Sequence, residues 1–259
     1  MRTLCQDFLC HRNIEEKIMN IAVIFAGGSG QRMRSKDIPK QFLEMHRKPI
    51  IIYTLELFEK NPEIDAVVIS CLEEWIGHLQ ELLYKYRIEK VKKIVPGGST
   101  GQMSIFHGLE AAKEVSQGKE AIVLIHDGVR PLINDKIISD NIASVKKNGS
   151  AITTSVVQET ILVVNDDESI DYVPDRHHSR VAKAPQSFWL DEILDAHYKA
   201  QEEGITNYID SCTLMKHYGY KLFLVDGPGE NIKITTPNDF FVMRAFLDAQ
   251  ENQQFLCGD

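Results

Sequence analysis

"IFAGGSGQRMRSKDIPKQFL" (residues 24–43) sets three glycines and a series of basic side chains directly behind an apolar run. Glycines after a strand let backbone N–H groups approach an anion closely, because no Cβ stands in the way. Arg32, Arg34, Lys36 and Lys40 add positive charge to the same loop. This composition favours a polyphosphate ligand, although a glycine turn with solvated charges has the same composition.

Two known phosphate-binding loops do not match this stretch. The P-loop ends in Gly-Lys-Ser/Thr, whereas this run continues Gly30-Gln31-Arg32. The dinucleotide fingerprint needs a third glycine at the position of Met33. A nicotinamide-dependent dehydrogenase is therefore disfavoured, and the basic string 39–43 would be left without a role in it.

Strand-like apolar runs alternate with amphipathic helical patterns along the first 150 residues. Strands are expected at 20–26, 66–71, 91–95 and 121–128, and helices at 49–60, 73–86, 101–115 and 135–148. This alternation predicts an α/β fold, Rossmann-like, with a mostly parallel sheet and helices on both faces. Ligands bind such sheets beyond the carboxyl ends of the strands. The glycine loop, Gly97-Gly98 and Asp127 each follow or end a strand, so we expect them at one edge.

The stretch 151–185 interrupts the alternation. A long strand at 152–164, a turn at 165–169 and a returning segment at 170–176 predict a projecting β-arm at about 156–183. A hairpin that leaves the body buries little of itself, and it usually needs a partner surface.

The rest of the chain returns to mixed elements. After the arm we expect helices near 189–203 and 210–218, strands at 221–226 and 231–235, and a last helix that starts at Pro237 after a Thr236 cap. A capping box of Ser99 and Gln102 is expected before the helix at 101–115. Residues 1–18 are expected to be a poorly ordered extension, and residues 19–259 a single domain.

Bulk composition narrows the class of protein. The 259 residues carry a formal net charge of −8, which disfavours a non-specific nucleic-acid binder. No apolar run approaches the roughly 20 residues that span a bilayer, so no membrane partner is expected. The five cysteines are scattered without a C-x-x-C pair, which indicates reduced thiols and a cytoplasmic location.

Six ordered motifs carry a family resemblance. They are "AGGSGQRM" (26–33), "PKQFLE" (39–44), the pair Gly97-Gly98 with Ser104, "HDGVRP" (126–131), "APQSF" (184–188) and "NIKITTPND" (231–239). Together they resemble the cytidylyltransferases that act on 2-C-methyl-D-erythritol 4-phosphate or ribitol 5-phosphate, over residues 20–250. The resemblance implies a nucleotidyltransferase fold, CTP and a polyol phosphate as substrates, and Mg²⁺ as cofactor.

The resemblance also assigns roles around the nucleotide. It implies that Arg32 and Lys40 bind the triphosphate and that Lys233 holds the α-phosphate, these three being the catalytic cations. Asp127 would meet Mg²⁺ and the nucleotide, while Arg130 would order the site through hydrogen bonds. The resemblance further implies that CTP is bound by Ala26, Gly27, Gly28, Gly30, Gly97 and Ser104. From the sequence, each cation could also be a solvated or ion-paired side chain, and Ser104 could bond its own helix.

The arm and the segment after it would bind the acceptor. By resemblance, Thr160 and Arg176 bind the phosphate of the polyol, and the arm reaches into a neighbouring subunit of a homodimer. Asp210 could contact polyol hydroxyls, but Ser211 stands where relatives often carry a second acidic residue. The adjacent His177 and His178 have no further ligand at metal spacing, so they are interpreted as arm surface residues.

The finer pattern leans toward the ribitol-phosphate branch. Trp75, the run 84–86, Val129 and the run 233–236 look like that branch, which would give CDP-ribitol, pyrophosphate and a place in teichoic acid or capsule polymer synthesis. Methylerythritol phosphate is the alternative, and another alditol phosphate the third. A non-catalytic nucleotide sensor would lose Lys40, Asp127 or Lys233, and all three are present.

Overall fold

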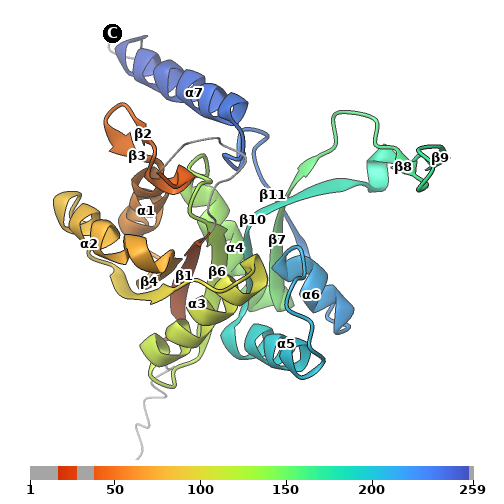
Figure 1. Cartoon of the computed structure of the whole chain (residues 1–259), viewed down its shortest axis with the longest axis horizontal. Coiled ribbons are helices and arrows are strands. Elements are labelled where there is room, and N and C mark those ends of the chain that lie inside the picture. The colour runs from red at the N-terminus through yellow and green to blue at the C-terminus, as the bar shows by residue number, and fades with distance from the viewer. Residues whose placement is uncertain (1–16, 28–37, 257–259) are drawn as a thin grey trace, which may run out of the picture.

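A computed structural model describes residues 17–27 and 38–256 of the chain (Figure 1). Its centre is a seven-stranded sheet with the order β11-β7-β10-β6-β1-β4-β5. The strands are β1 (Met19–Ala26), β4 (Ala66–Cys71), β5 (Val91–Pro96), β6 (Ala121–Asp127), β7 (Ser150–Val156), β10 (Arg180–Trp189) and β11 (Leu224–Asp226). All pairs are parallel except the two that β10 makes, so the expected mostly parallel α/β sheet is confirmed.

Strand β1 shows how the sequence covers both faces of the sheet. It lies between β4 and β6, and its alternate side chains enter two different cores. Ala22 and Ile24 pack toward one face, Ile21 and Val23 toward the other. A central parallel strand buried on both faces is expected to be apolar throughout, as this one is.

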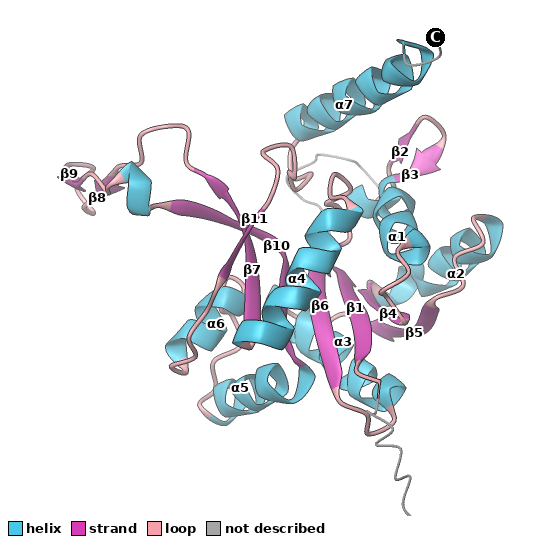
Figure 2. Cartoon of the chain, turned by 180° about the vertical axis from the view of Figure 1, so that it is seen from behind, coloured by secondary structure: helices cyan, strands magenta, loops and turns pink. Residues whose placement is uncertain are grey.

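The helices divide between these two faces (Figures 1 and 2). On one face lie α1 (Ile50–Lys60), α2 (Ile76–Lys85) and α4 (Asp135–Asn148). On the other lie α3 (Gly101–Ser116), α5 (Leu190–Glu202) and α6 (Ser211–His217). Short 3-10 turns occur at Lys40–Phe42, Glu73–Trp75 and Arg176–His178. Among the described residues, no helix combines the length and the apolar character that crossing a bilayer requires.

Strand β10 is the element that the sequence pattern missed. It runs antiparallel between β6 and β7, with a register shift between Ala182 and Gln186. Pro185 lies inside this shift, where a strand tolerates proline because the ladder is already interrupted. Such an irregular strand lacks strict alternation, which is why the pattern gave no signal for it.

The arm projects from the ends of β7 and β10 (Figure 1). The expected long strand at 152–164 was wrong, because β7 ends at Val156. Beyond it, only the short strands β8 (Val163–Val164) and β9 (Ile170–Tyr172) pair with one another. The described arm therefore has little regular structure to stabilise it.

Two smaller expectations also need correction. Residues 231–235 form no strand, although Ile234 N–H donates to the carbonyl of Val129 at 2.9 Å. The cap of α3 is Thr100, whose hydroxyl accepts from Met103 N at 3.1 Å, and not Ser99. Lys17 pairs with an Asp65 carboxylate oxygen at 2.5 Å, and residues 1–16 lie outside the described residues. The division into an extension at 1–18 and a single domain at 19–259 stays a prediction.

The last helix, α7 (Pro237–Leu256), starts after Thr236 as expected. Asp239 accepts from the Thr236 N–H at 2.7 Å, and the Thr236 hydroxyl accepts from Asp239 N at 3.4 Å. This reciprocal pair satisfies two N–H groups of the helix start.

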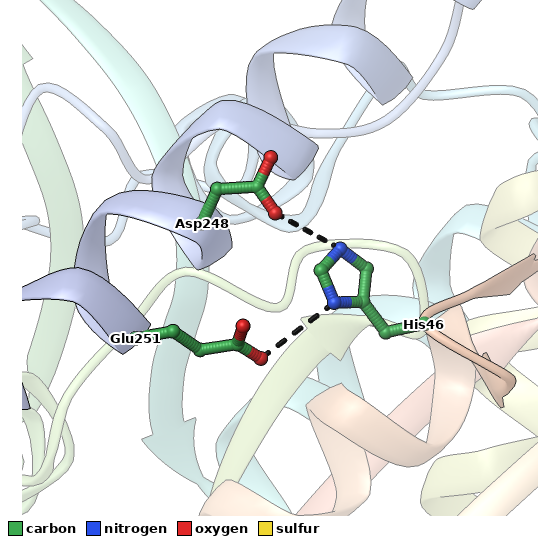
Figure 3. Close-up of side chains that lie close together, drawn as sticks. All are labelled: His46, Asp248 and Glu251. Carbon is green, nitrogen blue, oxygen red and sulfur yellow. Dashed lines mark ion pairs between the residues drawn. The ribbon is translucent and has the colours of Figure 1, made fainter.

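Helix α7 rests on the hairpin of β2 (Glu44–Met45) and β3 (Lys48–Pro49). His46, in the hairpin turn, places Nε2 3.1 Å from an Asp248 oxygen and Nδ1 3.6 Å from a Glu251 oxygen (Figure 3). These three side chains are close enough to surround a metal ion, but each ring nitrogen already faces a different carboxylate. We interpret these contacts as a link between the β2–β3 hairpin, which follows Lys40, and helix α7, which follows Lys233.

Candidate active site

A cavity of about 360 Å³ opens at the carboxyl ends of β1 and β6. The segments at the ends of β1, β5 and β6 meet there, as the strand-end rule predicts, and the segments of Lys40 and Lys233 complete the wall. It is lined by Phe25, Ala26, Gly27, Lys40, Gln41, Gly98, Ser99, Thr100, Gly101, Ser104, Asp127, Val129 and Lys233. We call it the first cavity.

A second cavity of about 190 Å³ shares four lining residues with the first: Phe25, Gly101, Asp127 and Lys233. The rest of its wall comes from Ile105, Ile125, Arg130, Ala182, Lys183, Ala184, Gln186, Ile209, Asp210 and Ser211. Since Asp127 and Lys233 belong to both walls, this ion pair stands at the junction of two neighbouring binding spaces.

Asp127 is a buried carboxylate held between two cations. Its side chain is 6% exposed, Lys233 Nζ lies 2.5 Å from Oδ1, and Arg130 Nε donates to Oδ2 at 3.0 Å. Burial by itself would raise the pKa of Asp127, but the charges of Lys233 and Arg130 outweigh it, and the pKa lies well below its usual range. The carboxylate is therefore a permanent negative charge at the junction.

Arg130 is fixed as the sequence led us to expect. Its Nη1 donates to the carbonyl of Asn231 at 2.9 Å, and Asn231 Nδ2 donates to the carbonyl of Ala184 at 2.8 Å. His126 Nε2 donates to the Arg130 carbonyl at 2.9 Å, and burial lowers the pKa of His126 to about 4, so it is neutral near pH 7. These bonds tie β6, β10 and the loop of Lys233 into one unit.

The floor of the first cavity depends on close backbone approach. Ser104 Oγ accepts from Gly98 N–H at 3.0 Å and donates to the Thr100 carbonyl at 2.9 Å. A Cβ on Gly27 would lie 2.9 Å from Ser104 Oγ, and one on Gly97 would lie 3.3 Å from Gly27 Cα. The crossing of these two loops therefore favours glycine, because a Cβ at either position would crowd Ser104 or the facing backbone. Ser104 bonds backbone, as one alternative held, and lines the cavity as well.

The expected site residues fall into three places. Ala26, Gly27, Lys40, Ser104, Asp127 and Lys233 line the first cavity, and Gly97 packs behind it. Asp210 lines the second cavity. Arg32, Gly28 and Gly30 lie outside the described residues.

Thr160 and Arg176 are brought together, but on the arm. Arg176 Nη2 donates to Thr160 Oγ1 at 3.1 Å, and both line a separate cavity of about 200 Å³. That cavity shares no lining residue with the first two. Within one chain, the arm residues thus stand apart from the Asp127 junction.

Lysine 233 differs from its expected setting. It lies in a loop and not in an apolar strand, and its side chain is 39% exposed. Lys233 forms an ion pair, which was the alternative to a catalytic role, and it also borders both cavities. Because it is half-exposed and borders both cavities, its ammonium can also reach a phosphate oxygen of a bound ligand.

Sequence reasoning missed several lining residues. Gly98 belongs to the glycine pair of the sequence motif, whereas Thr100 was not identified, because the cap was assigned to Ser99. Lys183 and Gln186 lie on β10, which the pattern did not identify. The proline of "APQSF" was the available signal, because proline inside a buried strand marks an irregularity.

Comparisons with known proteins agree with this geometry. The profile of the family "IspD: 2-C-methyl-D-erythritol 4-phosphate cytidylyltransferase" matches residues 20–249. A ribitol-5-phosphate cytidylyltransferase of Vibrio parahaemolyticus is 56% identical over 91% of this chain and 99% of that protein. One of Streptococcus agalactiae serotype V is 53% identical over 92% of this chain and 98% of that protein.

More distant relatives carry a different substrate in their names. A 2-C-methyl-D-erythritol 4-phosphate cytidylyltransferase of Clostridium acetobutylicum is 40% identical over 88% of this chain and 97% of that protein. Among solved structures, a 4-diphosphocytidyl-2C-methyl-D-erythritol synthase of Anaerococcus prevotii superposes with a TM-score of 0.77 at 27% identity. It covers 89% of this chain and 96% of that one.

The close packing at Gly98 generates a test of the first cavity. In Gly98→Ala the new Cβ would overlap Met103 Cβ and lie 2.8 Å from the Met103 carbonyl carbon, so the loop must shift. We expect CTP affinity to fall about tenfold, since overpacking costs about 1–3 kcal/mol. Titration calorimetry measures it. In the control Gly77→Ala, on α2, the Cβ has open space and affinity should stay unchanged. Equal affinities in both variants would contradict the assignment.

Proposed function

The chain is a nucleotidyltransferase that belongs to the 2-C-methyl-D-erythritol 4-phosphate cytidylyltransferase family, and from this premise we propose that it transfers CMP from CTP to D-ribitol 5-phosphate. An oxygen of the acceptor phosphate attacks the α-phosphorus of CTP and forms a new P–O bond. The bond from the α-phosphorus to the bridging oxygen of the β-phosphate breaks, and pyrophosphate leaves with that electron pair. The products are CDP-ribitol and pyrophosphate.

One observation carries the proposal: two cavities meet at the Asp127–Lys233 ion pair. A transfer between two phosphate esters needs two anionic ligands side by side, with a cation between them. The first cavity, with its glycine floor and Lys40, suits the nucleotide. The second cavity, with Asp210 and Gln186 on its wall, suits a polyol that offers hydroxyl groups.

The protein would act by position and charge. Lys233 would leave Asp127 Oδ1 for the α-phosphate, where negative charge builds during the transfer. Lys40, with Arg32, would neutralise the leaving pyrophosphate. Holding both substrates in line and stabilising the developing charge accounts for most of the rate gain expected for such transfers.

The site offers Mg²⁺ one buried carboxylate. Mg²⁺ commonly takes one or two carboxylates together with phosphate oxygens and waters. Both Asp127 oxygens are paired with cations, so the site fits the ion only once the nucleotide draws Lys233 away. Asp127 would then hold the ion, which would neutralise phosphate charge when bound.

The choice of ribitol rests on the relatives. Those at 53–56% identity are named ribitol-5-phosphate cytidylyltransferases, whereas a relative at 40% carries methylerythritol phosphate in its name. The family description favours methylerythritol phosphate as the second candidate. These acceptors differ in length and hydroxyl placement, and a site built on hydrogen bonds can discriminate such differences strongly.

A substrate panel tests the proposed function. Pyrophosphate release should be fastest with CTP and D-ribitol 5-phosphate, and EDTA should abolish it. ATP, GTP and UTP should be poor donors, since the relatives are named cytidylyltransferases. A higher kcat/KM with 2-C-methyl-D-erythritol 4-phosphate would reassign the acceptor, and no CTP-dependent release with any polyol phosphate would remove the proposal.

We further propose that the active form is a homodimer whose arms complete each other's sites. Two features support this proposal. Thr160 and Arg176 lie apart from the junction in their own chain. The arm also gathers exposed large apolar side chains, each 40–60% accessible: Val156, Ile161, Leu162, Val164, Ile170, Tyr172, Val173 and Val181. A second copy would cover them.

Complementation tests the shared site. Arg176→Ala damages the arm and Lys233→Ala damages the junction, so each homodimer should have less than about a tenth of the wild-type activity. A heterodimer of the two variants, isolated with two affinity tags, unites the intact junction of one chain with the intact arm of the other. It should regain about half of the wild-type activity, since one of two sites is whole. A heterodimer as inactive as both parents would contradict the shared site.

A further inference from the structure

An irregularity in β10 changes which side chains face the second cavity. Ala182 is opposite Thr154, but Gln186 is opposite Ile152, so β10 has two extra residues against β7. In a regular strand, neighbouring side chains point to opposite faces. Here the consecutive residues 182–184 all line the second cavity. Bulges near active sites commonly aim a side chain in this way, and the one that carries charge is Lys183.

Lys183 is a half-buried cation held by backbone oxygens. Its ammonium donates to the carbonyl of Gly229 at 2.9 Å and to that of Pro228 at 3.4 Å. Among the ion pairs found in the described residues, none includes Lys183. Burial lowers the pKa of Lys183, the charge of Arg130 lowers it further, and the charge of Glu230 offsets these effects only in part. An ammonium in this setting would be stabilised by an additional anion.

The charged side chains that line the second cavity favour the binding of such an anion. Three cations line it, Arg130, Lys183 and Lys233, against two carboxylates. Asp127 is already matched by Arg130 and Lys233. Asp210 caps α6 through Oδ1 and accepts from Gln186 Nε2 through Oδ2 at 3.0 Å. Lys183 is therefore the cation of this cavity whose charge no carboxylate balances within ion-pair distance in the described part of the chain.

We propose that Lys183 binds the phosphate group of the acceptor in the second cavity. This inference rests on the proposed function, since it assumes a polyol phosphate as the acceptor. The acceptor phosphate must approach the α-phosphate of CTP, and two anions come together only where cations offset their repulsion. Lys233 lines both cavities, whereas Lys183 lines the second cavity only. Lys183 thus sets the affinity for the acceptor and not the affinity for CTP.

A purely structural role makes different predictions. Through Gly229 and Pro228, Lys183 tethers the turn that leads to Asn231 and Lys233. If that tether were its whole contribution, loss of the ammonium would shift Lys233. kcat, CTP binding and thermal stability would then change together, while the acceptor KM would show no separate effect.

The experiment compares Lys183→Met, Lys183→Arg and the wild type, with Lys146→Met on the exposed side of α4 as a control for lost charge. Steady-state kinetics give the KM for D-ribitol 5-phosphate and for CTP, and a melting curve gives Tm. Lys183→Met should raise the acceptor KM about tenfold to a hundredfold, the loss of one charge-assisted bond. The CTP KM and Tm should stay near those of the wild type. Lys183→Arg should recover most of the acceptor affinity, and Lys146→Met should behave as wild type.

Calorimetry measures the affinity for the acceptor directly, without the chemical step. With a non-hydrolysable CTP analogue bound, D-ribitol 5-phosphate should bind Lys183→Met more weakly than wild type. An unchanged acceptor KM in Lys183→Met, or a parallel loss of kcat and CTP binding, would overturn the role of Lys183 while leaving the proposed function intact. If the wild-type enzyme uses another polyol phosphate, the same comparison of variants is made with that acceptor. A wild-type enzyme without activity on any of them would overturn both.

Discussion

The architecture of the site depends on one buried carboxylate between two cations. Asp127 ends the central strand β6 and holds Lys233 on one oxygen and Arg130 on the other. A buried charge that lost either partner would cost several kcal/mol, about 3–5 in comparable cases. The fold meets this cost with cations from a turn and from the loop before α7. Because Lys233 pairs with Asp127, its side chain lies at the junction where the two cavities meet.

This arrangement explains why the acceptor side is built from late segments of the chain. The loop of Lys233 is fixed by Asn231, which bonds the carbonyl of Ala184 on β10 and accepts from Arg130 through its own carbonyl. Strand β10 in turn carries Lys183 and Gln186, and Gln186 orients Asp210. Positions far apart in sequence thus depend on one another through a chain of directional bonds.

The nucleotide side is shaped by packing as much as by charge. Gln41 donates to the Ala26 carbonyl at 2.6 Å, which holds the segment of Lys40 against β1. Phe42 stacks on Trp75 with ring centroids 4.8 Å apart. Trp75 was one of the residues that suggested the ribitol branch, and it lines neither the first nor the second cavity. Trp75 supports the segment that carries Lys40, so we expect it to influence the reaction only through the placement of Lys40.

The sequence predicted what regular periodicity and strand-end placement determine. The parallel sheet, the split of helices between faces and the meeting of Gly27, Gly98 and Asp127 all follow from alternating apolar runs. It did not predict β10, whose bulge removes the alternation, and therefore it missed Lys183 and Gln186. It also read 231–235 as a strand, because an apolar run that contacts Val129 through one backbone bond has the same composition as a strand.

The most direct measurement is a crystal structure of the ternary complex with a non-hydrolysable CTP analogue and D-ribitol 5-phosphate. The account predicts the triphosphate in the first cavity and the acceptor phosphate in the second, with Lys233 between them and drawn from Asp127 toward the α-phosphate. Both ligands in one cavity, or phosphates bound away from the Asp127–Lys233 junction, would contradict it.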